Sequence, residues 1–344
     1  MKLIESNVEY IPQAEGLEGI YKQIEIAGRT AYKSEDKIVD VVNVDIDELP
    51  VGMNIEDIPS YKDNPSQCIS FLKEHNIEYK LISSARKFTD MLIRNKHYAA
   101  LEHGTVYLKI PAETWIEDKH EWECMFPEGL PWVSTDCDGD CWYITTNLRH
   151  IIEGNIGMKT MCDFLCNPTE KHEKRYTFKF TCDRGISHEL VRHRAFSPLQ
   201  ESTRFCNYMM DKFGNQVTFV IPSWITTTDK RRELLLKGDW QGDIWNYAED
   251  TFFELLDDAE RAYFTLLDNK YTPQEARAAL PNALKTELVM TGFASDWRYL
   301  LDLRYFEKTG PVHPDMKVLM QKLSALMHIT GVWDDVMKYP SKFD

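Results

Sequence analysis

Basic and hydroxyl side chains are concentrated in one short stretch, residues 189–205, which reads E-L-V-R-H-R-A-F-S-P-L-Q-E-S-T-R-F. The stretch contains three arginines, one histidine and an adjacent pair of hydroxyl residues: Arg192, Arg194, Arg204, His193, Ser202 and Thr203. Guanidinium and hydroxyl donors suit phosphate and carboxylate oxygens, and each charge-assisted hydrogen bond contributes about 1.5–3 kcal/mol. Two interpretations stand at this point: a solvated surface patch, the usual one for an R-H-R run, and an anion pocket, which the apolar neighbours of the stretch favour.

The elements around this cluster decide whether its arginines can meet. Apolar residues before the cluster predict a helix that ends near Arg194, because Pro198 disfavours helical backbone in the residue before it. On a continuing helix, Arg192 and Arg194 point to different faces. An anion pocket therefore requires that the helix ends there and that the chain turns back.

Length and composition are those of an ordinary globular protein: 344 residues, 43% hydrophobic and 28% charged. The chain has 55 acidic against 40 basic residues and a net charge of −15, which argues against a general nucleic-acid-binding protein, since such proteins present a basic face. No apolar run approaches the roughly 20 residues that span a bilayer, and the N-terminus lacks the apolar core of a signal peptide. We therefore expect a cytoplasmic protein that binds neither membrane nor nucleic acid.

The eight cysteines are scattered along the chain, and a chain of this size does not need disulfides, so we expect reduced thiols. Cys137 with Cys141, and Cys162 with Cys166, have a C-x3-C spacing. Structural zinc sites usually show C-x2-C pairs, so we expect no metal site.

Periodicity predicts one α+β domain over residues 1–344, a mainly antiparallel sheet with helices packed around it. Apolar spacing or a capping motif marks the expected helices: 17–32, 82–96, 148–167, 244–269, one between Thr272 and Pro281, 296–304 with Ser295 as its cap, and a last one after His313-Pro314. Alternation marks the expected strands: 106–110, 142–148, 175–182 and 217–222. The acidic, irregular segment 33–65 and the tryptophan-rich segment 113–146 read as insertions, the second as an elaborated hairpin.

Arg192-His193-Arg194, seven further residues and then Ser202 form an R-H-R-x7-S motif, which resembles the signature of the flavin-dependent thymidylate synthases, the ThyX family. Four more blocks are similar to that family in the same order: A-G-R-T-A-Y (27–32), L-E-H-G-T-V-Y (101–107), A-R-A-A-L-P (276–281) and L-D-L-R (301–304). Coincidence does not readily explain five ordered matches.

The resemblance implies an enzyme that methylates dUMP to dTMP. Members of the family are homotetramers in which FAD and dUMP bind where subunits meet. Methylenetetrahydrofolate supplies the carbon, and NADPH reduces the flavin. A pocket rich in fixed positive charge with no obvious base is compatible with these roles, because in such an enzyme the cofactor carries out the difficult chemistry and the protein binds and orients the reactants.

Site residues follow from the resemblance by position. Those expected to bind FAD are His103, Thr105, Arg192, His193, Arg194, Gln200 and Tyr299. Those expected to bind dUMP are Glu189, Arg192, Gln200, Glu201, Ser202, Thr203, Arg204, Arg277 and Arg304. Arg304 is the expected catalytic residue, because a guanidinium facing the uracil lowers the cost of negative charge on the ring.

The chain departs from the family at several positions. The family often has glutamine where this chain has Glu189, and an acid where it has Gln200. One branch has Asn and Arg where this chain has Phe293 and Ser295, so part of the flavin contact must be rebuilt; Arg298 and Tyr299 are candidates to substitute. These departures keep an alternative open: a non-catalytic nucleotide-binding relative of the family.

Overall fold

The molecule is organised around a four-stranded antiparallel sheet in the order β2-β8-β11-β9. The computed structural model describes residues 1–344 apart from 45–48, 51, 62–64, 128, 155, 205, 226–232, 234, 239–246 and 344. The two central strands, β8 (Arg175–Asp183) and β11 (Lys285–Phe293), pair along their whole length. The outer strands are β2 (Asn7–Tyr10) and β9 (Ser197–Gln200). Both central strands are almost entirely buried, because other elements cover both faces of the sheet.

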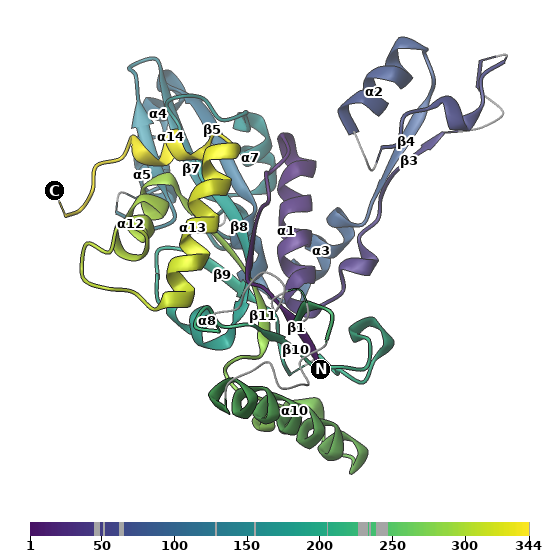
Figure 1. Cartoon of the computed structure of the whole chain (residues 1–344). Helices are drawn as coiled ribbons and strands as arrows, with labels where there is room; N and C mark the ends of the chain where they lie inside the picture. The colour runs from purple at the N-terminus through teal and green to yellow at the C-terminus, as the bar shows by residue number, and fades with distance from the viewer. Residues whose placement is uncertain are drawn as a thin grey trace.

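One face of this sheet carries mainly C-terminal helices, drawn in yellow in Figure 1. These are α12 (Ala294–Arg304), α13 (Pro314–Ile329) and α14 (Val332–Met337), and the mid-chain helix α8 (Arg184–Leu190), drawn in teal, shares their hydrophobic core. Trp297 is fully buried at their centre, and its ring packs edge-on against Phe178 of β8 and Phe196, with centroid distances of 4.9 and 4.5 Å. This packing fixes α12, whose last residue is Arg304, against the sheet.

The other face meets α1 (Gly16–Tyr32), which packs against β9 and β11. α1 also shares a hydrophobic core with a three-stranded antiparallel sheet in the order β5-β7-β6 (Thr105–Pro111, Cys141–Asn147 and Ser134–Cys137). Short helices surround it: α3 (Ala85–Arg94), η4 (Tyr98–His103), α4 (Ala112–Glu117), α5 (Lys119–Met125), α6 (Leu148–Glu153) and α7 (Met158–Phe164).

Two smaller units complete the fold. The first is a parallel pair, β1 (Lys2–Ile4) with β10 (Thr218–Val220), packed with α10 (Tyr247–Asp268). The short elements near it are η5 (Asp211–Phe213), α11 (Pro273–Ala276) and η6 (Arg277–Ala279). The second projects from the body (Figure 1), and we call residues 38–84 the arm. It contains β3 (Asp40–Val44), η3 (Ile55–Asp57), α2 (Pro65–Glu74) and β4 (Tyr79–Ser83), and η1 (Glu35–Lys37) precedes it.

The expected fold class is confirmed: helices and mainly antiparallel sheets are mixed in one chain, with β1 and β10 as the parallel exception. The strand over 175–182 and the helices over 17–32 and after His313 are found nearly as expected. In the described part of the chain, no helix is both long and apolar enough to cross a membrane.

Several expected boundaries were wrong. The helix before the R-H-R motif ends at Leu190, not near Arg194. The segment 148–167 forms two helices: α6 ends at Glu153 and α7 begins at Met158, directly after Gly157, which has a positive φ of 80°. Ser295 does not cap α12; the Asp296 carboxylate accepts a hydrogen bond from the Phe293 N–H at 3.0 Å instead.

The two segments interpreted as insertions are more ordered than expected. Segment 33–65 contains β3, which pairs with β4, and segment 113–146 contains two helices before its hairpin. The start of the helix expected at Ile244 lies outside the described residues; α10 is described from Tyr247.

Candidate functional site

The R-H-R motif lies in a tight reversal between α8 and β9. The Asp183 carboxylate caps α8 by accepting from the Ile186 N–H at 2.9 Å. After Leu190 the chain turns, with the N–H of Phe196 donating to the His193 carbonyl at 3.1 Å, and then pairs with β11 as β9. The chain therefore turns back, as an anion pocket requires, but both Arg192 and Arg194 stay exposed.

Arg304 meets the motif from the end of α12. Its Nε donates to His193 Nε2 at 3.2 Å, and its Nη1 lies 3.3 Å from the Glu189 carboxylate. Burial, reinforced by the Arg304 charge, lowers the pKa of His193 to about 4. His193 is therefore neutral at pH 7 and accepts through Nε2. Arg304, which is distant in sequence, thus joins Glu189 and His193 of the motif region in one cluster through an ion pair and a hydrogen bond.

A cavity of about 530 Å³ lies beside the motif, and Arg194 lines it. Its polar and aromatic walls include Glu102, Trp132, Asn147, Arg149, Arg175 and Arg194. Arg175 is only 8% exposed; its Nη1 donates to the Glu102 carbonyl at 3.1 Å, and its Nε has no hydrogen-bond partner. Burial lowers the pKa of Arg175. A cavity with this positive charge is suited to an anionic ligand.

A second cavity, of about 580 Å³, contains Gln200 and Ser202 in its wall. Arg149 and Glu153 line both cavities, so the two lie side by side. The Gln200 amide donates to Ser187 Oγ at 2.8 Å and Thr286 Oγ1 at 3.1 Å, which holds it against α8 and β11. Arg194, which is expected to bind FAD, lines the first cavity, and Ser202, which is expected to bind dUMP, lines its neighbour.

Of the remaining expected dUMP residues, Glu201, Thr203 and Arg204 follow β9, and Arg277 begins η6. Arg277 donates from Nη1 to Thr203 Oγ1 at 3.1 Å, which joins two residues that lie 74 positions apart. Arg204 is exposed on the same loop. Glu201 is 3% exposed and forms an ion pair with Lys285 at 2.9 Å, so this carboxylate is already engaged within the protein.

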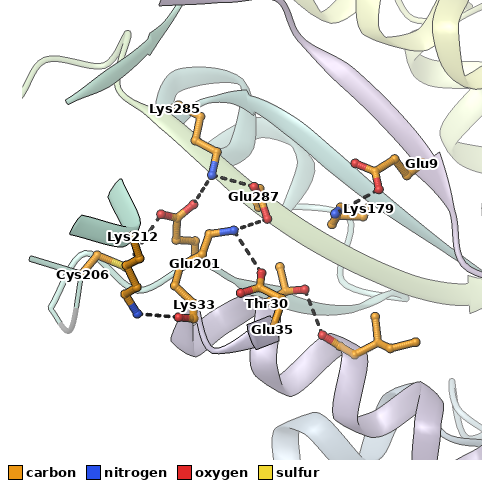
Figure 2. Close-up of polar contacts among 11 residues, drawn as sticks. Glu9, Thr30, Lys33, Glu35, Lys179, Glu201, Cys206, Lys212, Lys285 and Glu287 are labelled. Carbon is orange, nitrogen blue, oxygen red and sulfur yellow. Dashed lines mark hydrogen bonds and ion pairs between the residues drawn. The ribbon is translucent and has the colours of Figure 1, made fainter. Parts of the chain in front are cut away.

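Figure 2 shows the wider ionic chain to which Glu201 belongs. Lys285 lies between two carboxylates, 2.9 Å from Glu201 and 2.6 Å from Glu287, and Lys33 pairs with Glu287. Burial raises the pKa of Glu287, but the charges and hydrogen bonds of Lys285 and Lys33 outweigh it and lower the value to about 2. The chain of alternating charges connects the end of α1 with β11 and the loop after β9.

The other expected FAD residues lie apart from the Arg304 cluster. His103 is fully buried, its Nδ1 is 2.8 Å from Thr291 Oγ1, and burial with the charge of Arg175 lowers its pKa to about 3. Thr105, 3% exposed, lines a third cavity of about 420 Å³, which Arg175 also lines. Tyr299 stacks on Phe343 with ring centroids 5.8 Å apart.

Phe293 and Ser295, the two positions that depart from the family branch, and Arg298, a candidate to substitute, all have partners within the protein; the Ser295 N–H donates to the Glu173 carboxylate at 3.2 Å. Phe293 is 5% exposed, and the Arg175 guanidinium lies 5.5 Å from its ring centroid. Arg298 is 8% exposed and pairs with Asp302 at 3.3 Å. Arg298 is thus held inside the protein by a carboxylate.

Sequence reasoning missed Arg175, Arg149, Trp132 and the Lys33–Glu287–Lys285 chain. Arg175 is the first residue of β8, the strand predicted over residues 175–182. A charged residue at the end of a strand that is expected to be buried could have indicated a binding site. All eight cysteines are free thiols. Among the described residues, no group of three or more histidine, cysteine, aspartate or glutamate side chains could hold a metal ion.

Comparison with known proteins agrees with the motifs. The family model described as "Thymidylate synthase complementing protein" matches residues 171–327. The flavin-dependent thymidylate synthase of Corynebacterium efficiens is 32% identical over 172 residues, which cover 50% of this chain and 59% of that protein. The enzyme of the same name from Mycobacterium tuberculosis is 32% identical over 153 residues, covering 43% and 54%.

The chain thus spans little more than half the length of these curated relatives. Among solved structures, the UMP/dUMP methylase PolB from Streptomyces cacaoi bound with 5-Br dUMP is 13% identical, with 98% of each chain covered and a TM-score of 0.38. The sequence comparisons confirm that this chain resembles the flavin-dependent thymidylate synthases across the part that carries the R-H-R-x7-S motif.

Proposed function

We propose that this protein is a flavin-dependent thymidylate synthase, which converts dUMP to dTMP with methylenetetrahydrofolate as carbon donor and NADPH as reductant of FAD. The observation that carries the proposal is the cluster of Glu189, His193 and Arg304. Two blocks similar to the family, the R-H-R motif and L-D-L-R, meet there through a direct hydrogen bond. Family resemblance in sequence and contact in space thus support the same site.

The side chains beside the motif fit a bound FAD. The cavity lined by Arg194 also contains the buried Arg175, whose Nε lacks a partner, and such a guanidinium is stabilised by an anionic ligand. Arg192, His193 and Arg194 would hold the cofactor, and His103 and Thr105 would contact it from η4 and β5. When bound and reduced, the flavin supplies the reducing equivalents for the methyl group.

The neighbouring cavity is where we place dUMP. Ser202, Thr203, Arg204 and Arg277 offer hydroxyl and guanidinium donors for its phosphate. Arg304, fixed by a neutral histidine and a carboxylate, would face the uracil and favour negative charge on the ring. Arg304 would act as a fixed positive charge and not as a base, because a guanidinium does not titrate usefully near pH 7.

We further propose a homotetramer whose sites are shared between subunits, working in a reducing compartment such as the cytosol. Exposed Arg192 and Arg194 support this assembly, because a second chain placed over them would enclose the bound cofactor. The eight free thiols fit a reducing compartment.

The test is direct. Purified protein with added FAD should be yellow, should be bleached by NADPH, and should form dTMP from dUMP and methylenetetrahydrofolate. Colourless protein without turnover after addition of FAD would refute the proposal.

A second candidate is a non-catalytic nucleotide-binding relative. The burial of Phe293 and the engagement of Arg298 by Asp302 favour it, because neither is free to rebuild the flavin contact. It predicts dUMP binding without reduction of any bound flavin by NADPH, so the same absorption experiment separates the two candidates.

A further inference from the structure

The cavity beside Arg194 has an aromatic wall that the R-H-R motif does not supply. Trp132, from segment 113–146, lines this cavity and keeps 43% of its surface exposed. It is nevertheless anchored: its indole N–H donates to His150 Nδ1 at 3.2 Å, and its carbonyl accepts from Thr146 Oγ1 at 2.9 Å. Large aromatic side chains normally gain stability by burial, so an anchored but exposed indole at a cavity indicates a ligand.

His150 determines how the indole is held. Because an indole N–H can only donate, His150 Nδ1 must accept, and its proton lies on Nε2, which donates to the Met125 carbonyl at 2.8 Å. Burial lowers the pKa of His150, which keeps this neutral form at pH 7. His150 itself is fixed, because its backbone N–H donates to the Asn147 cap of α6 at 2.9 Å.

The same cavity has guanidinium groups in its wall. Arg149 is paired with Glu102 at 2.5 Å and Glu153 at 2.6 Å, so its charge is balanced. Arg175 has no ion pair among the described residues, and Arg194 is exposed. A flat aromatic surface beside unbalanced guanidinium groups suits a heteroaromatic ring that carries anionic groups.

We propose that Trp132 is a stacking platform for the heteroaromatic ring of the ligand in this cavity, and that Arg175 and Arg194 receive its anionic groups. We take the ring to be that of FAD, and this assignment rests on the proposed function. The platform gives segment 113–146 a role in the site. The cavity volume of about 530 Å³ lies within the usual range for small-molecule sites.

The test compares Trp132→Leu and Trp132→Phe with Trp224→Leu. Trp224 is a matched control, because it is 49% exposed and packs on Phe252 instead of lining this cavity. Quenching of flavin fluorescence during titration with protein gives Kd for FAD. We expect Trp132→Leu to bind about tenfold more weakly, as for the loss of one stacked ring, and Trp132→Phe and the control to stay close to wild type.

A second measurement uses the wild-type protein and does not depend on the folding of any variant. N-bromosuccinimide oxidises exposed tryptophans, and peptide mass spectrometry locates the products. FAD should protect Trp132 and leave Trp224 reactive. Unchanged FAD affinity in Trp132→Leu, together with no protection of Trp132, overturns the platform.

Parallel oxidation experiments with NADPH, 5-formyltetrahydrofolate or dUMP in place of FAD identify which molecule supplies the stacked ring. If FAD does not bind but one of these protects Trp132, the platform stands and the flavin-dependent function fails. If the protein makes dTMP with FAD while Trp132 is neither protected nor required, the function stands and the platform fails. Protection by none of the four ligands, together with no dTMP formation after addition of FAD, contradicts both.

Discussion

Arg304 connects the proposed chemistry to individual atoms. A guanidinium held by His193 and Glu189 is oriented before any ligand arrives, and preorganised donors stabilise developing charge best. Its neighbour His193 is kept neutral by burial, which lowers its pKa to about 4, so no like charge competes with Arg304 at pH 7.

We therefore expect Arg304→Ala to lower kcat for dTMP formation by about 10²–10³-fold, the usual effect of losing one such donor, while FAD remains bound. Steady-state kinetics and the flavin spectrum of the purified variant measure the two effects separately. Arg261→Ala serves as the control, since Arg261 is 68% exposed on α10 and, among the described residues, forms ion pairs with neighbouring acids of that helix. An Arg304→Ala enzyme with wild-type kcat would remove this residue from the mechanism.

At the scale of elements, the ionic chain in Figure 2 joins α1 to the central sheet. Glu287 of β11 pairs with both Lys33 and Lys285, and its side chain is 14% exposed. Removing one partner of a buried ion pair costs about 3–5 kcal/mol, and partial exposure reduces this figure.

We expect Glu287→Gln to lower the free energy of unfolding by about 2 kcal/mol at pH 7, measured by urea denaturation. The loss should shrink on acidification. Because the pKa of Glu287 is lowered to about 2, its contribution is complete above the unfolded pKa of about 4.5 and disappears as pH falls through the folded value. Glu233→Gln, in a pair with Lys237 that is 64% and 66% exposed, should leave the free energy of unfolding unchanged within experimental error. Equal effects of the two variants would contradict the assigned role of the buried chain.

The arm, residues 38–84, is attached through a narrow base. The Ser84 N–H donates to the Val39 carbonyl at 2.9 Å, and the Val39 N–H donates to Ser84 Oγ at the same distance. The arm has its own small apolar cluster of Val44, Cys68, Leu72 and Ile77. Its two ends are therefore close together, and its core is separate from the main cores.

We expect that replacing residues 40–83 with a short glycine linker leaves the rest of the protein folded, with a change in unfolding free energy below about 1 kcal/mol, because closing a short loop between neighbouring ends costs little. Circular dichroism and urea denaturation measure this. Deleting residues 113–146 is the contrasting control. That deletion should prevent folding, since Trp115 and Trp122 are 3% and 6% exposed in the core around β5 and β7. Loss of folding in the arm deletion alone would show that the arm is required for the body.

The elements that sequence reasoning identified are those whose pattern is set locally. β8 alternates over its whole length, and the capping box of Thr272 and Glu275 was found as expected, with the Thr272 N–H donating to the Glu275 carboxylate at 2.8 Å. β11 was missed, although it is central, because a strand buried on both faces loses the alternation that marks a strand. Arg304 and His193 lie 111 positions apart in the chain, so neither local spacing nor charge could predict their contact. The motifs located the residues of the candidate site, and only the packing of α12 against the sheet brought them together.

At the scale of the whole molecule, buried histidines make stability depend on pH. Burial and the charge of Arg175 lower the pKa of His103 to about 3, and burial and Arg304 lower that of His193 to about 4. In the unfolded chain both titrate near 6.5. Between these values the unfolded state binds more protons, so the stabilisation is complete above about pH 6.5 and is lost as the pH falls. Asp296 acts in the opposite direction, because burial raises its pKa to about 6 and the folded state then binds the extra proton.

His103 and His193 outweigh Asp296, and burial lowers the pKa values of His150 and His172 in the same direction, so we expect the free energy of unfolding to be about 2 kcal/mol lower at about pH 5.5 than at about pH 7.5. Urea denaturation at intermediate pH values measures the slope in a range where exposed carboxyl groups remain charged. His193→Gln keeps a neutral acceptor for the Nε of Arg304 but removes one titrating group, so its slope should be shallower. Asp296→Asn should make the slope steeper, since the opposing group is gone. A wild-type protein whose stability is constant or rises on acidification over this range would show that these histidines are not buried in the neutral form, and the neutral acceptor assigned to Arg304 would fall with them.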